Sequence, residues 1–333
     1  MKRICYLLVV SVSLFACKKE NDNPKIDNIN PRLTLDSLEI LVSNIPNAIY
    51  SDLTFINEVT GFAISQGFIE KTTDGGNTWA TTNLPISIPL KKIQFTDNQT
   101  GYVIGGDDTF GVLLKTTDGG QNWSVKKLNA FECPYGMFFL NNSTGFITGK
   151  NLFIKTTDGG QTWTSMKSNA FRMFQDINFK NNIEGYVTST NGVYFKTMNG
   201  GVSWDSLGYN STNYLYDIYF TGSKTLVRDG WNGNILVDLE NNYARTVIPL
   251  NITKFLFFNQ QKSIGIGSHW VEPSYYFSNG DILITNDGWK TFEQKTFATN
   301  DAINFTAIAK MSDTQSMILS VGLGGTKVII LNR

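Results

Sequence analysis

The chain has 333 residues, and its 28 basic and 28 acidic side chains give no net charge at neutral pH. No basic stripe or charged block is visible, which argues against a nucleic-acid partner. His269 is the only histidine, so a histidine-based zinc centre is excluded. We expect neither a metal nor a cofactor.

The first residues have the pattern of an export signal. Basic residues 2 and 3 precede an apolar run at 4–15, and Leu14-Phe15-Ala16-Cys17 resembles the lipobox of bacterial lipoproteins. We predict that residues 1–16 are a lipoprotein signal peptide and that Cys17 becomes acylated; an ordinary secretory signal is the alternative. The apolar run is too short to span a membrane. The acyl chains would instead hold the protein at the membrane surface.

Residues 17–32 are rich in Asn, Asp and Lys and are expected to form a flexible, lipid-anchored tether. The lipobox resemblance implies a bacterial cell envelope, with the protein as an outer-membrane lipoprotein that faces the periplasm or the surface. Beyond Cys17 only Cys133 remains, so no intrachain disulfide is expected.

One phrase recurs along the rest of the chain. Lys-Thr-Thr-Asp-Gly-Gly-x-x-Trp occupies residues 71–79 and returns at 115–123 and 155–163. Looser copies lie at 196–204 and 285–292, and we place a sixth, eroded copy at 236–243 with its aspartate at Asp238. Self-similarity at such a period is typical of repeat architectures.

Each copy follows short runs of β-branched and aromatic residues separated by Gly, Asn and Asp turns, and no long helical period competes with them. Four strands per repeat are typical of a propeller blade. We predict an all-β, seven-bladed β-propeller over residues 33–333, with four-stranded antiparallel blades; six blades are the alternative. A strand within residues 33–42 would complete the last blade and close the ring.

The phrase has a local structural logic. Its Thr and Asp side chains can bond to nearby backbone groups, and its glycines permit unusual backbone angles. We therefore expect each box carboxylate to accept hydrogen bonds within its own turn rather than to bind calcium. The predicted structural positions are Asp74, Gly76, Trp79, Asp118, Gly120, Trp123, Asp158, Gly160, Trp163, Asn199, Gly201, Trp204, Asp238 and Asp287.

The phrase Thr-x-Asp-x-Gly-x-x-Trp resembles the Asp-box, or bacterial neuraminidase (BNR) repeat. Together with a preceding Gly-aromatic strand, it is similar to the propeller of the photosystem II assembly/stability factor family, over residues 48–333. The resemblance implies a propeller fold and allows several functions, because the same box occurs in sialidases, glucan hydrolases and non-catalytic propellers.

The sequence lacks a complete catalytic set. The sialidase family uses an arginine cluster, and here Arg172 follows Phe171 without that family's proline and in the middle of the chain. A glucan hydrolase needs two carboxylates that face each other across a cleft, and the sequence alone does not show which carboxylates do so. A Cys133–His269 dyad is conceivable, but a cysteine before a proline at a strand start is typical of a buried apolar position. We therefore expect a protein that is not an enzyme, with a glycoside hydrolase as the alternative.

Two loops depart from the regular repeat. We interpret residues 228–233 in blade five and 268–279 in blade six as loops between second and third strands, and they carry the two tryptophans outside any box, Trp231 and Trp270. Aromatic residues on such loops either pack over their own blade or bind a partner. The candidate ligand-binding residues are Arg228, Asp229, Trp231, His269, Trp270, Glu272, Tyr275, Tyr276, Arg172 and Asp217.

The leading hypothesis is a lipid-anchored, monomeric binding or assembly scaffold whose partner contacts the loop face of blades five and six. The partner is a protein, as the family resemblance implies, or a glycan, because Trp and Tyr beside carboxylates suit sugar stacking. A glycan-cleaving propeller and a spacer without a ligand are the alternatives.

Overall fold

The computed structural model describes residues 33–332, with gaps at 35–37, 42–43, 131, 167–172, 209–212, 231–234, 249, 271–277, 298–303, 314 and 322–326. The chain separates into Met1–Pro31 and Arg32–Arg333. The predicted signal peptide, tether and Cys17 lie outside the described residues. Within the described part, no helix has the length and hydropathy needed to cross a membrane.

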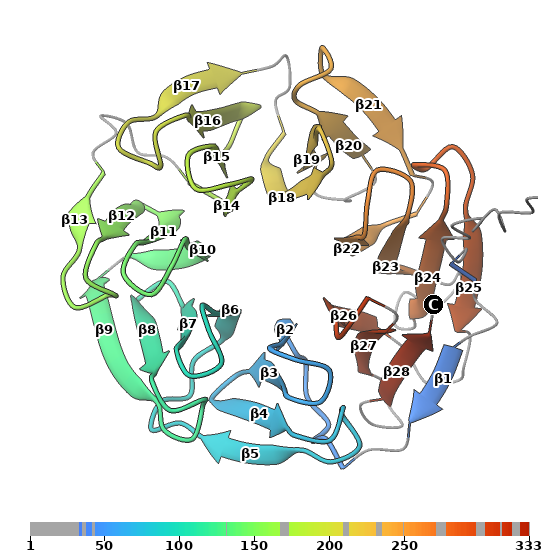
Figure 1. Ribbon diagram of the computed structural model, residues 1–333, viewed down its shortest axis with the longest axis horizontal. Coiled ribbons are helices and arrows are strands. Elements are labelled where there is room, and N and C mark those ends of the chain that lie inside the picture. The colour runs from blue at the N-terminus through green and yellow to red at the C-terminus, as the bar shows by residue number, and fades with distance from the viewer. Residues whose placement is uncertain are drawn as a thin grey trace, which may run out of the picture. The chain divides into compact units, whose positions relative to one another are not determined.

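Six blades are each built from four consecutive antiparallel strands, as Figure 1 shows. Blade one comprises β2 (Asp52–Phe55), β3 (Gly61–Ser65), β4 (Phe68–Thr72) and β5 (Ala80–Asn83). Blade two comprises β6 (Leu90–Phe95), β7 (Gly101–Gly106), β8 (Phe110–Thr116) and β9 (Ser124–Ala130), and blade three β10 (Cys133–Phe139), β11 (Gly145–Lys150), β12 (Leu152–Thr156) and β13 (Thr164–Ser165). Blade four comprises β14 (Ile177–Phe179), β15 (Gly185–Thr188), β16 (Val193–Thr197) and β17 (Asp205–Gly208). Blade five comprises β18 (Leu215–Thr221), β19 (Lys224–Asp229), β20 (Ile235–Asp238) and β21 (Ala244–Val247), and blade six β22 (Ile252–Phe257), β23 (Ser263–Trp270), β24 (Ser278–Thr285) and β25 (Glu293–Phe297).

The last sheet is composite. It consists of β26 (Asn304–Lys310), β27 (Gln315–Val321) and β28 (Lys327–Asn332), and β1 (Leu38–Leu41) pairs with β28 at its outer edge. Buried side chains of β26 and β27 pack against blade one on one side and blade six on the other.

The prediction of a seven-bladed ring closed by an N-terminal strand is corrected here. Six blades, not seven, consist of four strands that follow one another in the sequence. The N-terminal strand β1 lies within the predicted residues 33–42 and pairs with β28. Leu33 does not join it, because its backbone N–H and C=O bond to the side chain of Asn286, both at 2.9 Å.

The apolar core lies between neighbouring blades. Second strands such as β7 are buried along their whole length, and each complete box places its tryptophan against the preceding blade. Trp204 of blade four, for example, meets Phe146 of blade three edge to face, with ring centroids 6.0 Å apart. The box tryptophan therefore joins two blades rather than packing only on its own hairpin.

The box turn is a compact hydrogen-bonded unit. In blade one the Thr72 hydroxyl donates to Asp74 Oδ1 (2.8 Å) and accepts from the Gly76 N–H (2.8 Å), while the Thr78 N–H donates to the same carboxylate (2.9 Å). The two glycines have φ of 71° and 93°, a region that other residues rarely adopt. These bonds occupy the Asp74 carboxylate in its own turn.

The eroded copy in blade five is shifted from its predicted position. Strand register aligns Leu226↔Asp238 with Phe62↔Lys71 of blade one, so Asp238 occupies the lysine position and Asn241 the aspartate position. The following residues, Asn242 and Tyr243, take the positive φ values of the two glycines, 47° and 56°. The prediction of Asp238 as the box aspartate is therefore wrong, because the strand runs further than the letter pattern suggests.

Candidate functional site

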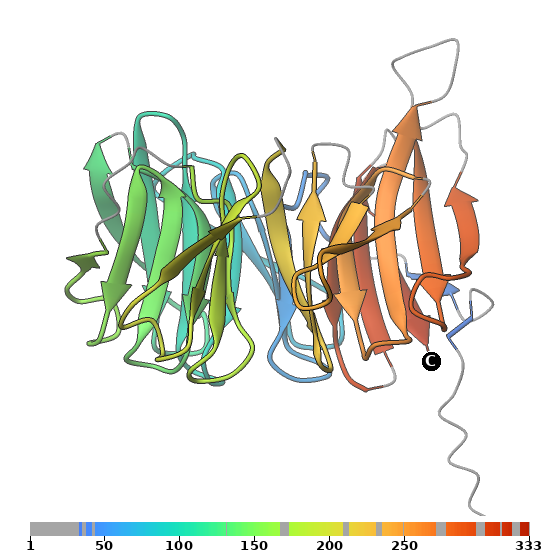
Figure 2. The same ribbon diagram turned by 90° about the horizontal axis from the view of Figure 1, so that it is seen from above.

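All inner strands begin at the same face of the propeller, which we call the mouth face. Up-and-down pairing puts the connections between second and third strands on this face, and the box turns on the opposite one, the box face (Figure 2). Near their starts, β6, β10, β18, β22 and β26 each contain a β-bulge. The bulge aims two successive side chains toward the central channel and the next blade.

These positions form two layers around the channel. The residues at the bulge, or at the equivalent register, we call the rim: Ser51, Lys91, Tyr135, Gln175, Tyr216, Thr253 and Thr306. The residues that follow them we call the inner ring: Asp52, Lys92, Gly136, Asp176, Asp217, Lys254 and Ala307. Five inner-ring side chains line a cavity of about 350 Å³ in the channel: Asp52, Lys92, Asp176, Asp217 and Lys254.

The charges of the inner ring are paired within the protein. Lys92 of blade two forms an ion pair with Asp176 of blade four. Lys254 of blade six lies 3.4 Å from Asp52 of blade one, and Arg228 lies 2.8 Å from Asp217. Three acids and three bases thus converge with no net charge, so the channel attracts neither anions nor cations as a whole.

The electrostatic environment stabilises the charged forms of two of these groups. Burial alone would lower the pKa of Lys92, but the carboxylates of Asp176, Asp217 and Asp52 raise it above its usual value. Burial acts on Asp217 in the opposite sense, and Arg228, Lys92 and Lys254 nevertheless lower its pKa. The pKa of Asp176 is raised by burial against the opposing effect of Lys92.

The hydrogen bonds of Asp176 and Asp52 argue for a structural role rather than catalysis. The Asp176 carboxylate uses one oxygen for Lys92 and accepts the Ile218 N–H (3.1 Å) with the other, and its side chain is 6% exposed. Asp52 likewise accepts the Ile93 N–H (3.0 Å) while its second oxygen faces Lys254. Each carboxylate therefore links inner strands of different blades, and both of its oxygens have a partner within the protein.

The rim is more open than the inner ring. Ser51 and Thr253 use their hydroxyls to bond to backbone carbonyls of the following blade, at Leu90 (2.7 Å) and Phe305 (3.4 Å). Lys91 instead places its ammonium 2.9 Å from Cys133 Sγ and 4.3 Å from the centroid of the Tyr135 ring.

A second group of aromatic rings lies at the start of β18. Tyr216 stacks on Tyr214, with centroids 6.2 Å apart, and Arg228 lies 4.6 Å from the Tyr216 ring. Tyr214 is 37% exposed. The mouth face thus presents tyrosine rings and cations above a neutralised channel.

The described residues include only part of the predicted site. Arg228 and Asp217 come together as an ion pair, and Asp229 is buried at the end of β19, 3.4 Å from Arg245. His269 and Trp270 end strand β23, where their backbones pair with β24. The following predicted residues lie outside the described residues: Arg172, Trp231, Glu272, Tyr275 and Tyr276.

The predicted loop boundaries are therefore wrong at two places. Arg228 and Asp229 belong to β19, and the pairing of β23 with β24 extends through Ser268–Trp270 and Ser278–Asn279. The strands extend beyond their apolar residues because backbone pairing between neighbouring strands continues there, whereas the apolar pattern alone predicts an earlier end.

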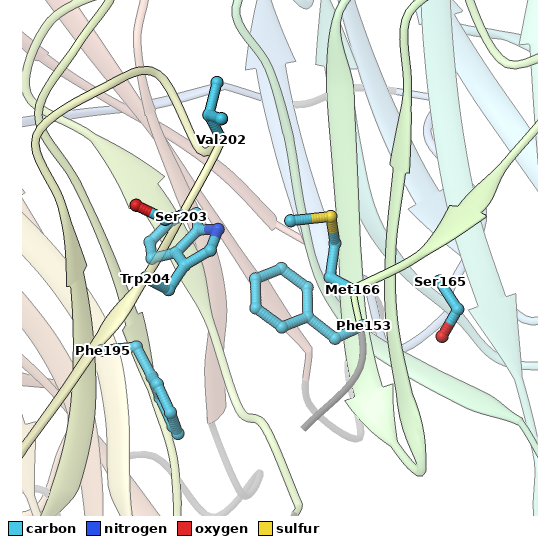
Figure 3. Close-up of a pocket in the computed structure, with 7 residues that line it drawn as sticks. All are labelled: Phe153, Ser165, Met166, Phe195, Val202, Ser203 and Trp204. Atoms are coloured by element: carbon cyan, nitrogen blue, oxygen red, sulfur yellow. The ribbon is translucent and has the colours of Figure 1, made fainter. Parts of the chain in front are cut away.

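A second cavity, of about 310 Å³, lies between blades three and four. Figure 3 shows Met166 beside Phe153, with Trp204 of the neighbouring blade facing them. It exists because β13 has only two residues and covers little of β12. The described residues that line it are apolar or carry a hydroxyl group.

A repeated sequence pattern marks the inner ring, although the prediction of a binding site on the loops did not use it. Each inner strand of the six contiguous blades contains an apolar-x-Phe triplet at or next to its end, and the residue just before that triplet belongs to the inner ring. In all but blade three this residue is charged. Of these residues the predicted site includes Asp217, whereas it lacks Asp52, Lys92 and Lys254.

Comparisons of the sequence and of the fold with known proteins also point to a propeller. A family model described as photosynthesis system II assembly factor YCF48 matches residues 37–130 and again 76–171. Over residues 37–171 the chain is therefore similar to this family of propellers. The sequence matched none of the curated proteins with which it was compared.

The fold of the chain is similar to that of solved structures. A YCF48 bound to D1 peptide is 20% identical, with a TM-score of 0.69 over 91% of this chain and 99% of that one. YCF48 from Cyanidioschyzon merolae is 15% identical, with a TM-score of 0.66 over 89% and 99%. The GH74 xyloglucanase from Xanthomonas campestris is 10% identical, with a TM-score of 0.62 over 85% of this chain and 53% of that chain. At these identities the likeness shows the fold alone.

Proposed function

We propose that this propeller is a non-catalytic scaffold that binds a protein partner on its mouth face. The observation that carries the proposal is the contrast between the two layers of the channel. The inner-ring acids form ion pairs within the protein, while the rim presents Tyr135, Tyr216 and Lys91. Aromatic and cationic side chains around a concave mouth are typical of binding surfaces. The D1 peptide bound to the related YCF48 supports a protein partner.

We further propose that the loops of blades five and six belong to this surface, and that the ligand contacts Trp231 and Trp270. Trp270 ends the extended strand β23, whose hairpin with β24 leads away from the ring on the mouth side. A tryptophan at such a position supplies a large contact area with little loss of conformational freedom.

The lipobox at Leu14-Phe15-Ala16-Cys17 supports a lipid anchor through Cys17. We propose that the tether of residues 17–32 holds the propeller at a bacterial outer membrane. Mass spectrometry of the full chain from its native membrane tests this: a diacylglyceryl group on Cys17 is expected, and an unmodified or differently cleaved N-terminus would contradict it.

Affinity capture from solubilised envelope membranes tests the binding face. The full chain is compared with Trp231→Ala, Trp270→Ala and Tyr214→Ala on the mouth face, and with Met198→Ala on the box face, where Met198 is 56% exposed. We expect the mouth-face variants to lose a partner that the Met198→Ala variant retains. Retention by all three folded mouth-face variants would place the binding surface elsewhere.

A glycan-binding or glycan-cleaving propeller is the second candidate function. It is favoured by one observation: Asp176 and Asp217 line the same cavity and have pKa values shifted in opposite directions, as in acid–base pairs. Incubation with a polysaccharide panel tests it. Oligosaccharides released by the wild type but not by Asp217→Asn or Glu272→Gln would replace the scaffold proposal.

A further inference from the structure

Lys91 occupies a rim position that other blades fill with a small hydroxyl side chain. Ser51 and Thr253, at the equivalent register, bond to a backbone carbonyl of the next blade and are thereby satisfied. The Lys91 ammonium reaches in the same direction but meets the Cys133 thiol at 2.9 Å and the Tyr135 ring at 4.3 Å. An ammonium has three N–H donors, and a thiol and a ring face are weak acceptors.

Among the residues that the structure describes, no carboxylate forms an ion pair that balances the charge of Lys91. Every other cation of the channel mouth in the described part of the chain has an acid: Lys92 has Asp176, Lys254 has Asp52 and Arg228 has Asp217. Asp108, which lies near Tyr135, is itself paired with Lys150 at 3.0 Å.

We propose that Lys91 and the Tyr135 ring form an anion subsite that receives a carboxylate from the bound partner. This deepens the proposed function, on which it rests, by naming the chemistry of the partner at one point of the mouth face. A single half-buried ammonium beside one ring suits a monoanion. Phosphate sites use several convergent donors, commonly a bidentate guanidinium, and Arg228 is already committed to Asp217.

The carboxylate can come from an acidic side chain or from a chain end, and three peptide probes separate these sources. The first is an octapeptide of alternating glycine and glutamate with both ends blocked. The second replaces glutamate by glutamine, and the third is the glutamine peptide with a free C-terminal carboxylate. Binding to the full chain is measured by isothermal titration calorimetry at low ionic strength, where charge contacts are least screened.

We expect the glutamate peptide, the free-carboxylate peptide or both to bind more tightly than the blocked glutamine peptide. Lys91→Met should weaken that binding about tenfold or more, as expected for the loss of a charge-assisted hydrogen bond, whereas Lys91→Arg should retain it. Lys310→Met is the matched control, because it removes the same charge from an exposed residue that is already paired with Asp313, at the end of β26 on the opposite face. It should bind as the wild type does.

Two results would overturn the subsite: equal affinity for all three probes, or equal losses in Lys91→Met and Lys310→Met. The second would mean that only the overall charge matters. Capture of the native partner separates this inference from the proposed function. If mouth-face variants lose the partner while Lys91→Met binds the acidic probes like the wild type, the subsite alone is wrong.

Discussion

Lys92 forms its ion pair with Asp176 across blade three, which contributes only a glycine to the inner ring. A Cβ atom at Gly136 would lie 2.5 Å from Thr148 Oγ1 and 2.9 Å from the Asp176 Cα. The missing side chain lets the backbone of blade four approach β10 closely. One ion pair and one glycine therefore connect three consecutive blades at the channel.

Removal of this pair should cost stability. Lys92→Met leaves the carboxylate of Asp176 with little exposure and without its partner, and we expect a loss of about 2–3 kcal/mol in the free energy of unfolding, somewhat below the cost for a fully buried pair. Lys92 keeps 27% of its side chain exposed, which reduces the loss. Urea unfolding measures it. Lys150→Met, which breaks an exposed pair, should change stability by less than about 1 kcal/mol; similar losses in both variants would refute the role of Lys92.

A methyl group at Gly136 should also destabilise the channel. Gly136→Ala places a Cβ against Thr148 and the Asp176 backbone, and relief of this overlap requires movement of a strand; we expect a cost of roughly 1–3 kcal/mol. Gly208, whose Cβ would have its nearest contact at 3.6 Å, is the control position. The thermal midpoint of Gly208→Ala should stay near that of the wild type, and a matching loss there would contradict the steric explanation.

The box carboxylates should make the propeller sensitive to acid. Hydrogen bonds from Thr162 and Thr156 lower the pKa of Asp158 to about 2. A lowered folded-state pKa stabilises the protein above the usual value of 3.8, and this contribution is lost as pH falls toward 2. Asp158→Asn should keep the turn, because Asn199 already makes the same backbone contacts in blade four. Its thermal midpoint should fall less than that of the wild type between pH 5 and pH 2; parallel curves would speak against the mechanism.

Glu70 should make the protein less stable as pH rises. Its side chain is fully buried, Thr81 donates to one oxygen at 2.8 Å, and the other oxygen has no donor among the described residues. Burial raises its pKa above the usual 4.5, so its contribution to stability is lost as pH rises from that value through the folded-state pKa. Glu70→Gln should flatten the stability curve above pH 5 and be more stable than the wild type at pH 8. A lower stability at pH 8 would show that the charged form is favoured.

The sequence predicted well what is local and repeated. The box phrases and the Gly-aromatic strand starts led to four-stranded antiparallel blades, because turn chemistry and strand alternation are encoded within a few residues. The prediction failed where a single residue was assigned to a box position without knowledge of the strand register, as with Asp238. The sequence also predicted loops at Arg228 and Trp270, where the cross-strand ladder continues.

The channel could not be assembled from local patterns. Lys254 meets Asp52 over a separation of 202 residues, and Lys91 meets Cys133 over 42. Such contacts depend on which blades are neighbours and on the bulges that aim the side chains. A comparison of equivalent positions across repeats, rather than a search for unusual loops, would have revealed the inner ring.

The central claim is that the partner binds the mouth face, and site-specific photo-cross-linking in native membranes tests it most directly. A photoreactive residue is placed at Tyr214 on the mouth face and, in a second protein, at Gln121 in an exposed box turn on the opposite face. We predict a discrete cross-linked partner from position 214 and none from position 121. A partner captured from position 121 but not from 214 would contradict the account.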